Sequence, residues 1–179
     1  MVRRVAADPS SANSGCGGVL AAACKEGKRE LLVRLLDAGA RVPPVLTACR
    51  SYLMSDPDLL RVLLASGMDP DLPNWQRATP LHDLSGRDSR GRPHRYRAEC
   101  ATILLEAGAS LTARDEDYRS TPLAWAARTG LADMVELLLA RGAPKQLADD
   151  ELWATPLAWA TRRGHAHITA ILRGTAASA

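Results

Sequence analysis

The sequence predicts an all-α solenoid, a row of helix-turn-helix units in which each unit packs against its neighbours. Three observations predict it. Residues 120–128 return in closely similar form as residues 154–162, an offset of 34 positions. A Thr-Pro pair stands at the same place in three such segments, and leucine-rich stretches end repeatedly at a glycine. A fixed period near this length is typical of stacked-repeat proteins, whose product is an extended binding surface.

The Thr-Pro pairs predict where the first helix of a unit begins. A threonine oxygen can accept a hydrogen bond from a free backbone N–H, and proline suits the first helical position because its missing N–H costs nothing there. The candidate N-caps are Thr79, Thr121 and Thr155. Gly130 and Gly164 follow eight residues after the last two prolines and are expected to end those helices.

The leucine-rich stretches predict the second helix of each unit. Each contains apolar residues at helical spacing and then a glycine that suits the left-handed position after a helix. These glycines are Gly39, Gly67, Gly108 and Gly142. Asp56 and Pro57 supply a cap and first position for the second helix of the second unit.

These motifs resemble the ankyrin repeat. Residues 79–82 read Thr-Pro-Leu-His, the opening of the family pattern, and Gly-Ala pairs end several units. Gly164-His165 is similar to the family's turn between helices. The resemblance implies an all-α ankyrin solenoid of about five units joined by short β-hairpin loops. The expected units are about 19–40, 44–68, 79–109, 121–143 and 155–174, after a flexible segment 1–18.

The chain departs from the family pattern at three kinds of position. Histidine follows Thr-Pro-Leu only at His82, so a threonine-to-histidine hydrogen bond is expected in the third unit alone. Arg77, Arg119 and Trp153 replace the hairpin glycine, although side chains tolerate a positive φ poorly. The third unit is eight residues too long, which predicts a loop insertion at about 86–97.

By the resemblance, a partner would contact the hairpin tips and the first helices of the units. The tips are residues 74–77, 116–119 and 150–153, with Trp75 and Tyr118 expected at equivalent positions. The candidate contact residues are Trp75, Gln76, Tyr118, Trp125, Arg128, Trp159, Arg162 and Arg163. Packing against neighbours is the alternative for the aromatic residues, and we favour at least partial burial of Trp125 and Trp159. A row of acidic residues at the tips is expected to orient the partner: Asp115, Glu116, Asp117, Asp149, Asp150 and Glu151.

A second hypothesis concerns the arginine-rich insertion, which could bind an anion or nucleic acid, or simply be a solvated loop. Its arginines are Arg87, Arg90, Arg92, Arg95 and Arg97. The net charge is only +3, so a nucleic-acid partner is not favoured.

The sequence indicates neither catalysis nor a cofactor. It has none of the usual nucleotide, hydrolase or zinc-protease motifs, so we expect no enzyme, cofactor or metal. No secretory signal pattern or membrane-spanning apolar run is present, which predicts a cytoplasmic location without membrane contact. We expect a monomer that binds another protein.

Overall fold

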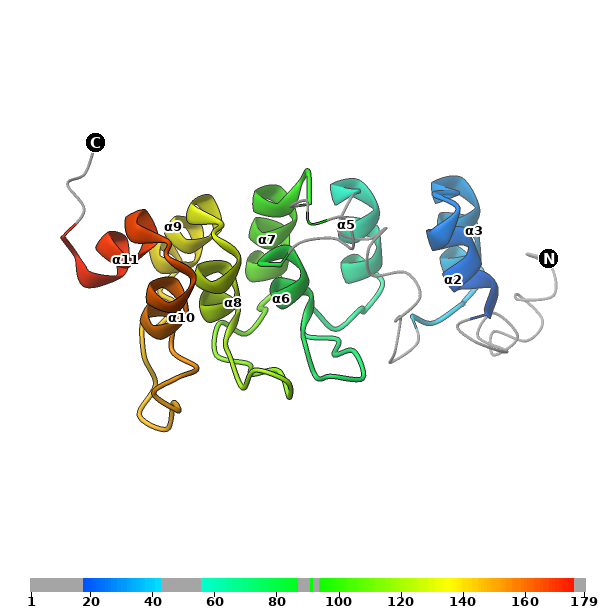
Figure 1. Ribbon diagram of the computed structural model, residues 1–179. Coiled ribbons are helices and arrows are strands. Elements are labelled where there is room, and N and C mark those ends of the chain that lie inside the picture. The colour runs from blue at the N-terminus through cyan, green and yellow to red at the C-terminus, as the bar shows by residue number, and fades with distance from the viewer. Residues whose placement is uncertain (1–17, 43–55, 87–90, 92–93, 176–179) are drawn as a thin grey trace.

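The computed structural model describes residues 18–42, 56–86, 91 and 94–175, and within them the protein is a row of paired helices (Figure 1). The helices are α2 (Gly18–Lys25), α3 (Arg29–Asp37), α5 (Pro57–Ala65), α6 (Pro80–Leu84), α7 (Arg97–Glu106), α8 (Pro122–Thr129), α9 (Ala132–Ala140), α10 (Pro156–Arg163) and α11 (Ala166–Arg173). Figure 1 shows α6, α8 and α10 in one row, which we call the inner row, and α7, α9 and α11 in a second, outer row. This arrangement confirms the all-α solenoid.

Some predicted segments lie outside the described residues. These are the N-terminal segment apart from Gly18, residues 44–55 of the second unit, and most of the arginine-rich insertion. The unit boundaries given above therefore stay predictions.

The predicted caps begin the helices. Thr121 Oγ1 accepts from the N–H of Ala124 at 3.3 Å, and Thr155 Oγ1 accepts from that of Ala158 at 3.2 Å. Asp56 caps α5 in the same way through the N–H of Leu59. Each of these helices has proline in its first turn, so the fixed φ of the ring also favours the start.

The predicted glycines end the helices. Gly130 and Gly164 have φ of 78° and 73° and close α8 and α10 in the left-handed conformation. The glycines after the second helices also have positive φ: Gly39, Gly67, Gly108 and Gly142. The turns between helices are therefore fixed by backbone conformation at residues that the sequence identifies.

The core is a continuous seam between the two rows. The second helix of each unit contributes a leucine that is at most 6% exposed. These are Leu32 of α3, Leu60 of α5, Leu104 of α7, Leu138 of α9 and Leu172 of α11. Burying such a side chain contributes about 1.5–3 kcal/mol. Buried alanines on α8, such as Ala126 and Ala127, leave room for close helix packing. Cys100 belongs to this core, and burial raises the pKa of its thiol to about 12.

The loops between units differ from the β-hairpins that the sequence predicts. No strand occurs in the described residues, and the loops are turns held by side-chain acceptors. Asn74 Oδ1 accepts from the N–H groups of Gln76 and Ala78, both at 2.9 Å. Single backbone bonds also close the turns, from the Asn74 N–H to the Ala78 carbonyl at 3.0 Å and from the Asp115 N–H to the Ser120 carbonyl at 3.3 Å.

Arg77 and Arg119 have φ of 57° and 47°, the left-handed conformation that glycine would adopt more easily. The third residue expected at such a position, Trp153, does not have a positive φ. Only two of the three substituted hairpin positions therefore carry backbone strain.

The predicted threonine-to-histidine bond is present in the third unit. Thr79 Oγ1 lies 2.9 Å from His82 Nδ1, and the Thr79 N–H donates to the same nitrogen at 3.0 Å. Because Nδ1 accepts, Nε2 carries the proton and donates to the Ser120 carbonyl at 3.0 Å. The fully buried His82 thus ties the third unit to the fourth.

Candidate functional site

Four aromatic side chains gather where α8 and α10 meet the turns that precede them. We call Tyr118, Trp125, Trp153 and Trp159 the aromatic cluster. Tyr118 lies between Trp125 and Trp159, with ring centroids 5.6 and 5.7 Å away and the rings close to perpendicular. Trp153 meets Trp159 edge-on at 6.2 Å. Each such edge-to-face pair contributes about 0.5–1.5 kcal/mol in addition to the energy of burying its surface area. These contacts hold the four rings in a fixed arrangement, which we call the aromatic platform.

Three arginines stand against this platform, and we call Arg128, Arg162 and Arg163 the arginine group. The guanidinium carbon of Arg128 is 3.9 Å from the Tyr118 ring centroid and 5.2 Å from that of Trp159. Arg162 and Arg163 lie 4.6 and 5.9 Å from the Trp159 centroid. A cation over an aromatic face is attracted by the ring quadrupole, which holds these planar groups in place.

Asp115 positions both the turn and one ring of the cluster. Its side chain is almost fully buried and accepts from the N–H groups of Tyr118 and Ser120 at 2.9 and 3.0 Å. It also accepts from the indole N–H of Trp125 at 3.0 Å. A buried carboxylate requires such donors, and three are supplied here.

Ser120 anchors the next tryptophan. Its hydroxyl accepts from the indole N–H of Trp159 at 2.9 Å and lies within bonding distance of the carbonyls of Tyr118 and Ala154. Trp159 is only 5% exposed, and Ser120 is buried. Trp125 and Trp159 are therefore fixed by buried polar partners, with the guanidinium groups at the more accessible edge.

The electrostatic feature of this surface is a set of cations without carboxylate partners. Among the described residues, no ion pair involves any member of the arginine group. Within the described ranges, the hydrogen bond of Arg162 goes to the carbonyl of Trp153, and the buried Nε of Arg128 has no hydrogen-bond partner. Unpaired guanidinium N–H groups at an aromatic platform favour an anionic ligand.

The acidic residues of the tips are used within the protein. Arg114 binds Asp149 at 2.7 Å and Asp150 at 2.8 Å, and its hydrogen bond lowers the pKa of Asp149 to about 2. Arg119 pairs with Glu151 at 2.9 Å. The acidic residues of the last tip are thus paired with neighbouring arginines, whereas, within the described part of the chain, those of residues 115–117 are not.

The structure brings six of the eight candidate contact residues together. Tyr118, Trp125, Arg128, Trp159, Arg162 and Arg163 form one group, as described above. Trp75 is 78% exposed on an earlier tip. The Gln76 amide donates to the side chain of Asp117, while the Gln76 carbonyl accepts from the Glu116 N–H at 2.8 Å. Gln76 therefore joins one tip to the next.

One sequence-based equivalence is wrong. Trp75 and Tyr118 were expected at matching positions of successive tips. Arg77 and Arg119 are the left-handed residues of the two tips and so occupy equivalent positions. When the tips are aligned on these two residues, Tyr118 corresponds to Gln76 and not to Trp75. Trp75 and Tyr118 consequently have different surroundings: one side chain is exposed and the other is half-buried in the aromatic cluster.

The arginine-rich insertion contributes less than its sequence suggests. Arg87, Arg90 and Arg92 lie outside the described residues. Arg95 lies over the Tyr96 ring at 5.1 Å. Arg97 is the first residue of α7 and pairs with Asp133 of α9 at 2.7 Å, so its charge joins two helices. Among the described residues, Arg95 is therefore the one arginine of this insertion that has no carboxylate partner and could still bind an anion.

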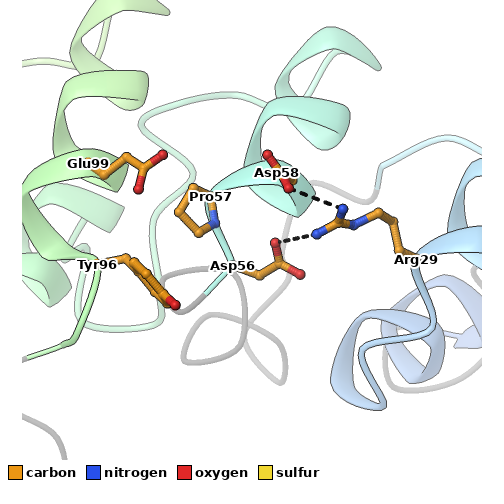
Figure 2. A pocket seen from close by; sticks show the side chains of 6 residues that line it. All are labelled: Arg29, Asp56, Pro57, Asp58, Tyr96 and Glu99. Carbon is orange, nitrogen blue, oxygen red and sulfur yellow. Dashed lines mark hydrogen bonds and ion pairs between the residues drawn. The ribbon is translucent and has the colours of Figure 1, made fainter.

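A hollow of about 450 Å³ lies between α3, α5 and α7 (Figure 2). Arg29 reaches across it to Asp56 at 2.9 Å and Asp58 at 3.2 Å. Glu99 on its other wall pairs with Arg61 at 3.2 Å. Each carboxylate here already has an arginine partner. We therefore interpret the hollow as a junction between helices and not as a ligand site.

Sequence reasoning missed the positioning roles of Asp115 and Ser120. Asp115 was grouped with the acidic tips, yet it is 3% exposed. A signal was available, since aspartate and asparagine favour turns in which the side chain accepts backbone N–H groups. Asn74 performs the same task in the preceding turn.

Comparison with known families agrees with this architecture. Residues 94–177 match the family model described as ankyrin repeats (3 copies). Residues 94–177, somewhat less than half of the chain, are therefore made of ankyrin repeats. Ankyrin repeats are generally protein–protein interaction modules, and the family is typically non-enzymatic. A search of curated proteins found no match. Within the part of the chain that the structure describes, no helix has the length and apolar character required to cross a bilayer.

Proposed function

We propose that this chain is a non-catalytic binding module that holds another protein on its inner row and adjoining tips. The contact surface comprises the aromatic cluster and the arginine group, with Trp75 as an outlying contact. The observation that carries the proposal is the arginine group itself, which stands on fixed aromatic rings without carboxylate partners among the described residues. Aromatic residues and arginine are enriched among the residues that dominate binding energy.

The proposal keeps the cytoplasmic, monomeric character expected from the sequence. The alternative of anion or nucleic-acid binding at residues 87–97 receives no added support, because Arg97 is paired with Asp133. The surface between α8 and α10 is the better supported site.

The test is a selection of random peptides of about 12 residues against the full immobilised chain, a length that in extended form is enough to cross two repeats. Binding of the selected peptides is then measured by fluorescence polarisation. The double variant Trp75→Ala, Tyr118→Ala should weaken it at least about thirtyfold, since each hot-spot residue contributes about 2 kcal/mol or more. Far-UV circular dichroism and a thermal melt establish that the variant remains folded.

The matched control is Glu136→Ala with Arg141→Ala, two exposed residues at α9 in the outer row. This variant should bind the peptides as the parent chain does. Peptides that bind the Trp75→Ala, Tyr118→Ala variant as well as the Glu136→Ala, Arg141→Ala control would show that the surface between α8 and α10 is not the binding site.

A further inference from the structure

We infer that the partner segment is an acidic peptide whose carboxylates are bound by Arg128, Arg162 and Arg163. This inference rests on the proposed function and specifies the chemistry of its ligand. It begins from a charge imbalance at the surface. The nearby carboxylates already have donors: Asp115 takes three N–H groups, and Glu151 takes Arg119 and the Trp153 indole. The arginine group has no equivalent internal partner among the described residues.

The guanidinium groups are prepared for carboxylates. The guanidinium carbon of Arg128 lies over the Tyr118 ring, 3.9 Å from its centroid, and that of Arg162 lies over the Trp159 ring at 4.6 Å. A guanidinium that stacks through its face keeps its N–H edge directed outward, and that edge matches a carboxylate in a two-bond geometry. Because stacking already restricts the side chains, less conformational entropy is lost when the ligand binds.

The spacing of the arginines limits the sequence of the peptide. Arg128 and Arg162 occupy equivalent positions in successive repeats, 34 residues apart. Their guanidinium carbons lie 5.2 and 4.6 Å from the same Trp159 centroid and so cannot be more than about 10 Å apart. An extended chain advances about 3.3 Å per residue, so it covers this distance in about three residues. Two acidic residues that bind these arginines are therefore at most about three positions apart, and a separation of two or three positions falls within this limit.

A single-stranded nucleic acid is the main competitor, because it also binds arginine and aromatic side chains. Base stacking needs an uncovered ring face. Here Arg128 covers Tyr118, and Trp159 is 5% exposed. Of these neighbouring rings Trp153, at 39% exposed, is the one left open, whereas a strand of successive bases needs several open rings. The cations also sit on two adjacent helices instead of forming a long stripe that could follow a phosphate backbone. These two observations favour a peptide.

The experiment uses the peptides selected on the full chain. We expect the selected sequences to be enriched in aspartate and glutamate at a separation of two or three positions. Their affinity should fall at least about tenfold for Arg162→Ala with Arg163→Ala, and should fall as sodium chloride rises from about 0.05 to about 0.5 M. Both substituted residues are exposed, so the fold should be retained.

Two further variants sharpen the result. Arg141→Ala with Arg173→Ala also removes two positive charges, but from exposed residues at the ends of α9 and α11. This variant should leave the affinity within about twofold of that of the parent chain. Arg128→Lys keeps the charge but loses the planar group stacked on Tyr118, and should weaken binding about tenfold. Equal losses in the α8–α10 variants and the α9–α11 variant would mean that only net charge matters, which would overturn the inference.

The outcomes separate this inference from the proposed function. Peptides without acidic enrichment that still lose binding in the Trp75→Ala, Tyr118→Ala variant would overturn the acidic-peptide inference and support the surface. Peptides whose affinity changes neither in Trp75→Ala, Tyr118→Ala nor in Arg162→Ala, Arg163→Ala would overturn both the acidic-peptide inference and the proposed function. An oligothymidylate of about 12 nucleotides that displaces the acidic peptides at lower concentration would assign the arginines to nucleic acid instead.

Discussion

The carboxylate of Asp115 accepts a hydrogen bond of 3.0 Å from the indole nitrogen of Trp125. The same side chain closes its own turn through the N–H groups of Tyr118 and Ser120. One buried group therefore connects the backbone of a turn with an aromatic side chain on the helix that follows. The shape of the proposed binding surface depends on this group, although Asp115 itself is nearly inaccessible.

The first prediction concerns Asp115. Asp115→Ala should lower the free energy of unfolding by about 3 kcal/mol or more, because three donors lose their acceptor in a buried place. Asp115→Asn keeps one oxygen and should cause a smaller loss. Urea unfolding followed by tryptophan fluorescence measures both variants, and Glu116→Ala at the exposed tip is the control. A loss for Asp115→Ala no larger than for the control would contradict the assigned role.

Much of this fold could be predicted from the sequence because its determinants are local. The Thr-Pro caps and the glycines after the helices act within one turn of the chain, and the structure places them as expected. The buried leucines follow from helical spacing in the same way. Repeated local signals at one period are enough to define a solenoid, because each unit contacts only its neighbours.

The candidate site was less predictable because its geometry depends on contacts between units. Trp159 and Ser120 are 39 residues apart, and Arg128 of one unit lies beside Trp159 of the next. The sequence identifies these residue types on one face, but not which ring each guanidinium contacts. Nor does it distinguish the buried Asp115 from exposed acidic neighbours, because that difference depends on the fold of the turn.

The second prediction concerns the strained turn at Arg77. This exposed residue has a φ of 57°, and a left-handed conformation costs a residue with a side chain about 1–2 kcal/mol. Arg77→Gly should therefore stabilise the protein by about 0.5–1 kcal/mol, after allowance for the greater freedom of glycine in the unfolded chain. The measurement is the urea midpoint. Arg77→Ala retains the strain and should show no such gain, so equal midpoints for the two variants would refute the explanation.

The third prediction compares two glycines in equivalent turns. Gly130 and Gly164 have φ of 78° and 73°, so an alanine at either position incurs a similar backbone strain. Their surroundings differ. A Cβ on Gly130 would lie 2.8 Å from the Cε1 atom of His165, whereas a Cβ on Gly164 would meet no atom within 4 Å.

Gly130→Ala should therefore be less stable than Gly164→Ala by about 1–2 kcal/mol, the usual effect of forcing an extra carbon into a packed site. The His165 ring also lies 3.3 Å from the Arg128 carbonyl through Nε2, which restricts how far it can move away. Adding His165→Ala to Gly130→Ala should remove the excess, because the double variant has no ring for the new carbon to strike. Urea unfolding of the three variants and of His165→Ala gives the coupling between the two positions. Additive losses would mean that the contact of His165 with Gly130 does not distinguish the two turns.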